Sequence, residues 1–233
     1  IYIYIVTYSV GGLCEAVFSI VRKHEINEGF LVTGMLIPLT LPPDIPLWMV
    51  GVATVFGIVI GKEIFGGTGF NVFNPALVAR AFLFFAYPAY MSGDKAWVVK
   101  PTNYYPQGDV DYITQATPLG DLANTAYDGT SPYVSELTGY TWSEMFLGFV
   151  PGSIGETSTL CVLIGALFLI MTGIGSWRTM IGCVFGMLFM TLTLNHIVGP
   201  LFVQENAFLF VTPHWHFVIG SFAFATVFMA TDP

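Results

Sequence analysis

The sequence predicts an all-α polytopic membrane protein, and its composition is the first observation behind this prediction. Of the 233 residues, 55% are hydrophobic and only 9% are charged, and the mean hydropathy is +0.71. A soluble domain usually carries about a quarter charged residues, so most of this surface must face lipid or other apolar partners. The formal net charge of −8 argues against nucleic acid as a partner, because phosphate backbones bind basic surfaces.

A series of apolar runs is the second observation. A membrane helix needs about 20 apolar residues to cross roughly 30 Å of hydrocarbon. A shorter run at 29–43 is interrupted by Pro38 and then by Pro42 and Pro43, as in a broken helix that lines a cavity. Runs of membrane-helix type occupy residues 1–21, 47–65, 74–91, 157–174, 179–199 and 214–230.

The order of these runs divides the chain into three parts. Residues 1–91 hold the first membrane helices, 92–156 form a long polar loop, and 157–233 hold a second set of membrane helices. The chain begins inside one apolar run and ends directly after another. We interpret it as an internal fragment of a longer polytopic protein that lacks both ends.

The basic residues predict the orientation in the membrane, because Lys and Arg near helix ends favour the cytoplasmic side. Arg22-Lys23, Lys62 and Arg178 all fall on one side if 29–43 crosses the membrane. That side is then cytoplasmic. The acidic loop at 92–156 is expected on the opposite, extracytoplasmic face.

A faint internal repeat relates residues 28–61 to residues 156–190. Each segment places a Glu before an apolar run, a Trp about 20 residues later, and a second apolar run with a Val-Phe-Gly step. By the charge argument, the first segment begins on the cytoplasmic side of the membrane and the second on the extracytoplasmic side. The repeat would therefore be inverted, as in many transporters. Chance similarity between two hydrophobic helix pairs explains the pattern equally well.

The stretch GKEIFGGTGFNVFNPALVARAFLFF, residues 61–85, combines a glycine-rich turn with a charged membrane helix. Its GGTG lacks the Lys-Ser/Thr of a phosphate-binding loop, so the glycines are expected to let the backbone approach a neighbour or a flat ligand. Asn74 is the predicted N-cap of the next helix and Pro75 its first residue. Arg80 is either a functional charge or a structural ion-pair partner, for example of Glu63.

Glu15 is a second charge within an apolar run. It lies about two turns before Arg22, and Gly11 and Gly12 open a gap beside it one turn earlier. A lone membrane carboxylate often belongs to an ion or proton path. A structural carboxylate with a partner is the alternative.

Neither the cysteines nor the histidines predict a metal or haem site. The three cysteines lack metal-type spacing, and we interpret them as small core residues. His214 and His216 are two residues apart and so point to different faces of a helix, and His196 offers no partner at matching depth for haem ligation.

The polar segment DVDYITQATPLGDL, residues 109–122, lies within the predicted extracytoplasmic loop. Thr117 is the predicted N-cap of a short helix that begins at Pro118. Its hydroxyl is also accessible to an external transferase, and a phosphate esterified there would lie at a helix N-terminus, which favours negative charge. Capping and phosphate attachment are therefore compatible.

Several stretches together resemble a known family. RKHEINEGF, FGGTGFNVFNPALVARAFLFFAYPA, PGSIGETSTL and FMATDP are similar to the B subunit of the sodium-translocating NADH:quinone reductase and, less closely, to the D subunit of the related Rnf complex. The resemblance implies an inverted-repeat helical bundle similar to urea and ammonium channels. It also implies a multi-pass protein of the bacterial inner membrane, with 92–156 on the periplasmic side.

The resemblance implies FMN, attached by a phosphoester to the last threonine of an Asp-x-x-(Ser/Thr)-Gly-Ala-Thr motif by a dedicated flavin transferase. Asp111, Thr114, Ala116 and Thr117 match the motif in type and spacing, and Thr117 is the expected attachment residue. Gln115 stands where the motif usually has glycine.

A second flavin, non-covalent riboflavin, and a quinone site are also implied by the resemblance. Asn71 and Asn74 are the expected donors to riboflavin. Gly11 and Gly12 are expected to admit a flat quinone head, and Glu15 to serve the sodium path. The other partners implied are further subunits of the reductase and membrane lipid.

The predicted function is that of a flavin-carrying subunit of an oxidoreductase, which passes electrons from NADH-derived partners through FMN and riboflavin to quinone, coupled to sodium export. NADH must bind another subunit, because this chain has no nicotinamide-binding fold. The alternatives are a channel or transporter for a small neutral solute, and a scaffold that only holds a complex together. Flavin bound to the purified protein would distinguish the predicted function from the channel, since a channel needs no flavin.

Overall fold

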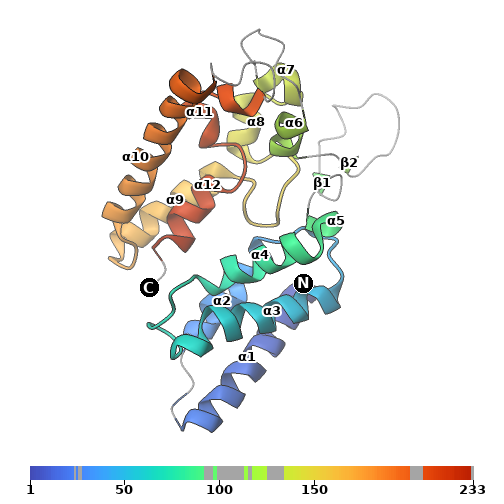
Figure 1. The fold of residues 1–233 in the computed structure, drawn as a ribbon, viewed down its shortest axis with the longest axis vertical. Coiled ribbons are helices and arrows are strands. Elements are labelled where there is room, and N and C mark those ends of the chain that lie inside the picture. Colours follow the sequence, from blue (N-terminus) through green and yellow to red (C-terminus); the bar gives the residue numbers. More distant parts are fainter. Residues whose placement is uncertain are drawn as a thin grey trace. The chain divides into compact units, whose positions relative to one another are not determined.

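The computed structural model describes residues 1–23, 25, 28–91, 97–98, 113–114, 117–124, 134–199 and 207–231. Within these residues the fold is helical, apart from β1 (Trp97–Val98) and β2 (Ile113–Thr114), which form one short antiparallel pair. The predicted all-α class is confirmed. The chain divides into two compact units, Ile1–Lys95 with Ser153–Gly155, and Ala96–Gly152 with Glu156–Asp232; Figure 1 shows the elements of each.

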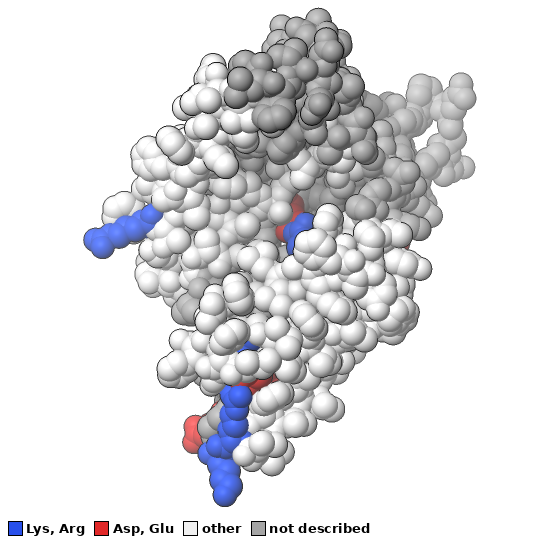
Figure 2. All heavy atoms as spheres, in the orientation of Figure 1, with Lys and Arg blue, Asp and Glu red and all other residues white. Residues whose placement is uncertain are grey.

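Three helices of the described residues are long and apolar enough to cross a membrane: Tyr2–Arg22, Leu47–Phe65 and Trp177–Val198. Lipid-facing surface should carry few charges, because charged side chains are costly in hydrocarbon. Figure 2 shows a described surface made almost entirely of uncharged residues on the face in view. The helix lengths and this surface agree with a membrane protein.

The first unit is a bundle of helices that alternate in direction. It contains α1 (Tyr2–Arg22), α2 (Gly29–Leu39), α3 (Leu47–Gly61), the 3-10 turn η1 (Glu63–Phe65), α4 (Pro75–Ala86) and α5 (Pro88–Met91). A Cβ added at Gly51 would lie 3.8 Å from Val6, and one added at Gly11 would lie 3.2 Å from Ile58. The contacts advance along both chains together, so α1 and α3 run parallel.

The α4 helix runs back along α3. The Phe56 and Phe82 rings stack with their centroids 4.5 Å apart, and the Trp48 and Tyr87 rings meet edge to face at 5.5 Å. Aromatic pairs of this kind add packing energy beyond their buried area. They hold α4 antiparallel to α3, so the connection that carries Asn71 and Asn74 lies at the C-terminal end of α3.

The α2 helix ends near Pro38, as the interrupted run predicted. Pro38 lies inside the helix and lacks the N–H that would bond to the Gly34 carbonyl one turn earlier. The Thr7 hydroxyl lies 3.1 Å from that carbonyl. Beyond the proline the helix stops at Leu39, whose carbonyl accepts a bond from the Gly155 N–H at 2.8 Å.

The second unit joins the described part of the polar loop to the later membrane helices. Its elements are α6 (Pro118–Asn124), α7 (Val134–Thr138), α8 (Trp142–Leu147), α9 (Thr159–Met171), α10 (Trp177–Thr193), the π-helix η3 (Leu194–Val198), the 3-10 turn η5 (Ala207–Phe210), α11 (Pro213–His216), α12 (Phe222–Phe224) and the π-helix η6 (Ala225–Met229). Leu122, Tyr140 and Met145 are buried in one apolar cluster with Val211 and Val218. The short loop helices thus pack on the segment that leads into the last apolar run.

That last run, 214–230, is not one helix, so this part of the prediction is wrong. α11 ends at His216, and the chain turns before α12 begins at Phe222. The turn contains Gly220, whose φ of 71° lies in the left-handed region that glycine adopts without strain. Sequence periodicity did not detect the break, because the residues of the turn are as apolar as those of the helices.

The two repeat segments are both pairs of helices joined by short connections. α2 and α3 form the first pair, and α9 and α10 form the second. Ser158 and Ser176 begin the helices of the second pair as N-caps, with side-chain oxygens that accept the N–H groups of Cys161 and Thr179. The similarity of 28–61 and 156–190 is therefore a similarity of helix pairs, and their inverted relation stays a prediction.

Candidate functional site

Thr117 lies between β2 and α6 and is half-buried. Its Oγ accepts a hydrogen bond from the Gly120 N–H at 3.2 Å, and its carbonyl accepts one from the Asp121 N–H at 3.0 Å. Pro118, the first helical residue, has no N–H to satisfy. The predicted N-cap is confirmed, and the hydroxyl of interest is held at the start of α6.

The rest of the attachment motif is described only in part. The Thr114 backbone pairs with Trp97 across β1 and β2. Asp111, Gln115 and Ala116 lie outside the described residues. The roles of Asp111, Thr114 and Ala116 in flavin attachment therefore stay predictions.

Glu15 is not a lone carboxylate, because Lys62 donates a hydrogen bond from Nζ to its Oε1. The side chains of Glu15 and Lys62 are only 2% and 3% exposed. Removing one partner of a buried ion pair leaves an uncompensated charge and is strongly destabilising. Of the two interpretations of Glu15, the structure supports the carboxylate with a partner. The role of Glu15 in an ion path stays a prediction.

A second ion pair crosses between the same two segments. Arg22 donates to the Glu63 carbonyl at 2.5 Å, and the two side chains lie 3.5 Å apart between Arg22 Nη1 and Glu63 Oε2. The C-terminal ends of α1 and α3 therefore lie together. This arrangement agrees with the charge argument, which placed Arg22 and Lys62 on one side of the membrane.

Gly11 and Gly12 lie on different surfaces of α1. Gly11 is buried, and a Cβ there would meet Ile58 Cδ1 at 3.2 Å, so this glycine allows α1 and α3 to approach closely. Gly12 is half-buried, and a Cβ there would lie 3.6 Å from the Phe30 ring on α2. The space predicted beside Gly11 is thus filled by Ile58.

Asn71 and Asn74 flank the turn that leads into α4. Asn71 Oδ1 accepts the Gly69 N–H at 3.2 Å, while Asn74 Oδ1 accepts the Ala76 N–H at 2.9 Å as the predicted N-cap. Gly69, with a φ of 86°, is one of three glycines with positive φ in the GGTG turn. The local backbone therefore orients the two carboxamides.

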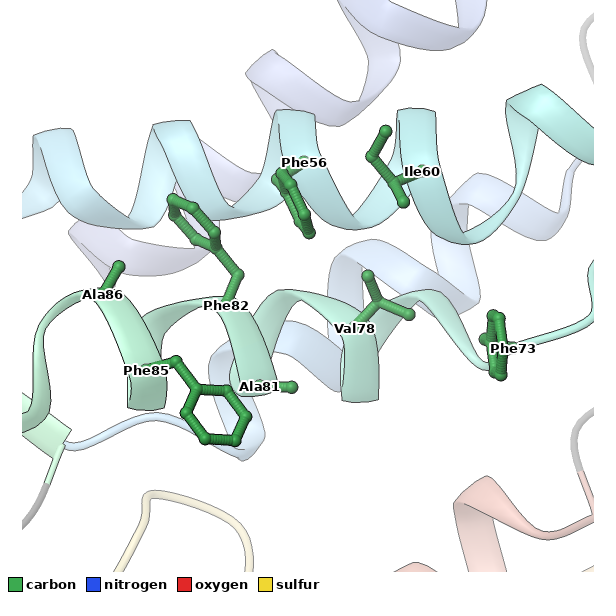
Figure 3. Close-up of a pocket in the computed structure, with 8 residues that line it drawn as sticks. All are labelled: Phe56, Ile60, Phe73, Val78, Ala81, Phe82, Phe85 and Ala86. Atoms are coloured by element: carbon green, nitrogen blue, oxygen red, sulfur yellow. The ribbon is translucent and has the colours of Figure 1, made fainter.

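An apolar groove runs between α3 and α4 and was not predicted from the sequence. Its volume is about 620 Å³, and its lining consists of phenylalanine, isoleucine, valine and alanine side chains. Figure 3 shows Phe56 extending from α3 toward α4, with Phe82 and Val78 extending back toward α3 and Ile60 on α3 beside them. Such a lining accepts an apolar chain and offers no hydrogen bond to a polar ligand.

Arg80 and His214 are the remaining candidates from the sequence. Arg80 is half-buried on α4, and Glu63, the partner considered for it, pairs with Arg22. His214 Nδ1 lies 3.1 Å from the Thr212 hydroxyl, and its carbonyl accepts a bond from Trp142 at 3.2 Å. In the described part of the chain, no group of three or more His, Cys, Asp or Glu side chains is placed to hold a metal ion.

The whole chain, residues 1–233, matches the sequence pattern of the NQR2, RnfD, RnfE family. The protein belongs to this family. Its relatives include three proteins named as the B subunit of the Na(+)-translocating NADH-quinone reductase. The relative from Chromohalobacter salexigens is 48% identical over 231 residues, 99% of this chain and 51% of the relative.

The other two relatives have similar identity and coverage. The protein from Azotobacter vinelandii is 50% identical over 231 residues, 99% of this chain and 53% of the relative. The protein from Yersinia pestis is 48% identical over 236 residues, 99% of this chain and 52% of the relative. The chain therefore spans about half the length of these members of the family.

Proposed function

We propose that this chain is part of the membrane-embedded B subunit of a sodium-translocating NADH:quinone reductase. In that role it carries FMN on Thr117 and passes electrons from NADH-derived partner subunits to quinone, coupled to sodium export. The names of the relatives support the complex, and their identity of 46–50% extends over nearly the whole chain. The observation that carries the flavin is the match of Asp111, Thr114, Ala116 and Thr117 to the attachment motif.

The surroundings of Thr117 fit a phosphoester. Attachment needs a hydroxyl oxygen, and Thr117 Oγ is held by the Gly120 N–H at 3.2 Å. That oxygen would form the bond to phosphorus as the bond from phosphorus to the leaving group of the flavin donor breaks, with loss of the hydroxyl proton, and the Gly120 N–H would remain a donor to the ester. When bound, FMN supplies reversible one- and two-electron chemistry. Thr117 only anchors the cofactor, so the protein's part is to hold it and exclude other reactions.

The second flavin is proposed to lie against the turn that contains Asn71 and Asn74. Asn71 uses its oxygen for the Gly69 N–H, so its Nδ2 is the end that can donate to a carbonyl or hydroxyl acceptor of riboflavin. Asn74 is held at the start of α4, close in sequence to that donor. The glycines of the turn, with φ values of 86° to 127°, let the backbone pass close to a flat ring.

Quinone is proposed to reach the first unit beside Gly12. Of the two glycines assigned to quinone, Gly11 is packed against Ile58 at 3.2 Å, whereas Gly12 faces the Phe30 ring. A flat aromatic head favours an offset stack on such a ring. Glu15 is proposed to serve the sodium path, which requires its contact with Lys62 to open.

The test is in-gel flavin fluorescence after denaturing electrophoresis, with the complex co-expressed with its flavin transferase. Wild type and Thr117→Ser should both fluoresce, because both keep the nucleophilic hydroxyl and the cap, and Thr117→Ala should be dark. Thr141→Ala is the matched control, since Thr141 caps α8 through a 3.3 Å bond from the Glu144 N–H but belongs to no flavin motif. It should fluoresce like wild type.

A dark band for wild type would contradict the proposed covalent attachment of flavin. It would favour the solute channel, which needs no cofactor. A bright band for Thr117→Ala would place the attachment elsewhere. Quinone reduction that continues unchanged in Thr117→Ala would support the scaffold function instead.

A further inference from the structure

The charged corner, which we define as Glu15, Ser19 and Arg22 of α1 with Lys62 and Glu63, contains more polar groups than two ion pairs need. Glu15, Ser19 and Arg22 are four and three residues apart, so they lie on one face of α1. That face meets the end of α3, where Lys62 and Glu63 are adjacent. Glu15, Ser19, Lys62 and Glu63 are each no more than 4% exposed.

The two ion pairs of the charged corner differ in how their positive groups are held. Arg22 contacts both the carbonyl and the carboxylate of Glu63, and its side chain is 32% exposed. The Lys62 ammonium donates to Glu15. The Lys62 backbone is fixed, because its N–H bonds to the Ile58 carbonyl and its carbonyl accepts from Phe65 and Gly67. The flexible stem of a lysine therefore lets the ammonium move while the backbone stays.

Ser19 is the group that ion pairing does not explain. Its Oγ is buried and has no hydrogen-bond partner among the described residues. A buried hydroxyl without a partner lowers stability, so its presence one turn from a buried carboxylate indicates a place for a ligand. Carboxylate and hydroxyl oxygens are the donors that hard cations prefer.

The charges of the corner also limit what can bind there. Glu15 and Glu63 balance Lys62 and Arg22, so the corner is neutral when both pairs are formed. A further cation beside Glu15 would place two positive charges on one buried carboxylate, which is costly away from water. A cation can therefore enter only as the Lys62 ammonium withdraws.

We propose that a sodium ion binds between the Glu15 carboxylate and the Ser19 hydroxyl, and that Lys62 is the tethered counter-ion it displaces. This inference deepens the sodium path of the proposed function and adds Ser19 and Lys62 to it. The exchange gives Glu15 a positive partner in both states and keeps sodium binding weak enough for release. Lys62 is thus a positioning residue that sets the affinity of Glu15 for sodium.

Sodium binding can be measured without electron transfer. A ligand that binds only the folded protein raises its melting temperature. We would titrate the purified complete complex with NaCl at constant ionic strength, using choline chloride as the replacement salt, and record the half-saturating sodium concentration. Sodium should raise the melting temperature of the wild type, and choline should not.

Two variants then test the residues separately. Ser19→Ala should raise the half-saturating sodium concentration about tenfold, because the ion loses a charge-assisted contact. If Ser19 had only a structural role, Ser19→Ala would leave the half-saturating sodium concentration unchanged. The sodium-free complex would then be as stable as the wild type or more stable, because an unpartnered buried hydroxyl lowers stability. Lys62→Gln should lower the half-saturating concentration about tenfold, because the competing charge is gone.

Two controls use the same substitutions outside the corner, one on α1 and one at the residue that follows it. Ser9→Ala removes an exposed hydroxyl and Lys23→Gln an exposed positive charge, and both should keep the wild-type half-saturating concentration. The proposal is overturned if sodium acts no differently from choline on the wild type, or if Ser19→Ala binds sodium as the wild type does. Ser19→Ala keeps the test decisive if Lys62→Gln fails to fold. Absence of flavin or of quinone reduction would defeat the proposed function without changing this titration.

Discussion

The Thr7 hydroxyl of α1 lies 3.1 Å from the Gly34 carbonyl of α2, at the place where Pro38 has no N–H to offer. Thr7 is fully buried, and its hydroxyl is also 3.0 Å from the Tyr4 carbonyl of its own helix. A side chain of α1 thus supplies a donor to the carbonyl that a proline leaves unsatisfied. This is one of the ways in which Pro is tolerated in membrane helices.

Thr7→Val should destabilise the protein by about 1–3 kcal/mol, because it leaves a buried carbonyl without a donor. The shape of the side chain is nearly unchanged, so packing is conserved. The measurement is the melting temperature of the purified protein in detergent. If the Gly34 carbonyl is the cause, Pro38→Ala in the Thr7→Val background should recover much of the loss by restoring a backbone N–H. A melting temperature unchanged by Thr7→Val would contradict this explanation.

Gly57→Ala should destabilise the protein by about 1–3 kcal/mol through overpacking. A Cβ at Gly57 would lie 2.6 Å from the Pro75 carbonyl oxygen and 2.8 Å from Ala79 Cβ, so α3 and α4 would have to separate. Gly182→Ala on α10 is the matched control, because a Cβ there meets nothing within 4 Å in the described residues. Equal melting temperatures for both variants would show that the α3–α4 contact is not as close as described.

Glu15→Ala should cost about 3–5 kcal/mol of stability at low sodium, since it leaves the buried Lys62 ammonium unpaired. Arg22→Ala should cost less, because the Arg22 side chain is 32% exposed, so water screens its pairing with Glu63 more than it screens the pairing of Lys62 with Glu15. Denaturant or thermal unfolding of the two variants in one detergent gives the comparison. The order of the two losses is the prediction, and a greater loss for Arg22→Ala would contradict it.

Local sequence signals predicted local structure well. Asn74 with Pro75, and Thr117 with Pro118, were assigned as helix starts, and both caps form the expected hydrogen bonds. Such contacts join residues two or three apart, so the sequence contains all that determines them. The turn around Gly220 was missed, because a single glycine in an apolar run does not identify a break.

Contacts between helices were harder to predict. Glu15 was recognised as unusual, yet its partner Lys62 is 47 residues away, and only the packing of α1 on α3 shows that they meet. The spacing of Glu15, Ser19 and Arg22, together with the adjacent Lys62 and Glu63, was a usable signal that was missed. The same holds for Gly57 and Gly61, which are four residues apart at the α3–α4 contact, as in membrane helix pairs.

The covalent flavin is the central claim, and peptide mass spectrometry of the purified complex tests it most directly. Proteolysis should yield the peptide that contains Thr117 with its mass increased by FMN less one water, and fragmentation should assign the added mass to Thr117. The same peptide from Thr117→Ala should carry no added mass. An unmodified Thr117 in a complex that retains covalent flavin on another residue would contradict the account.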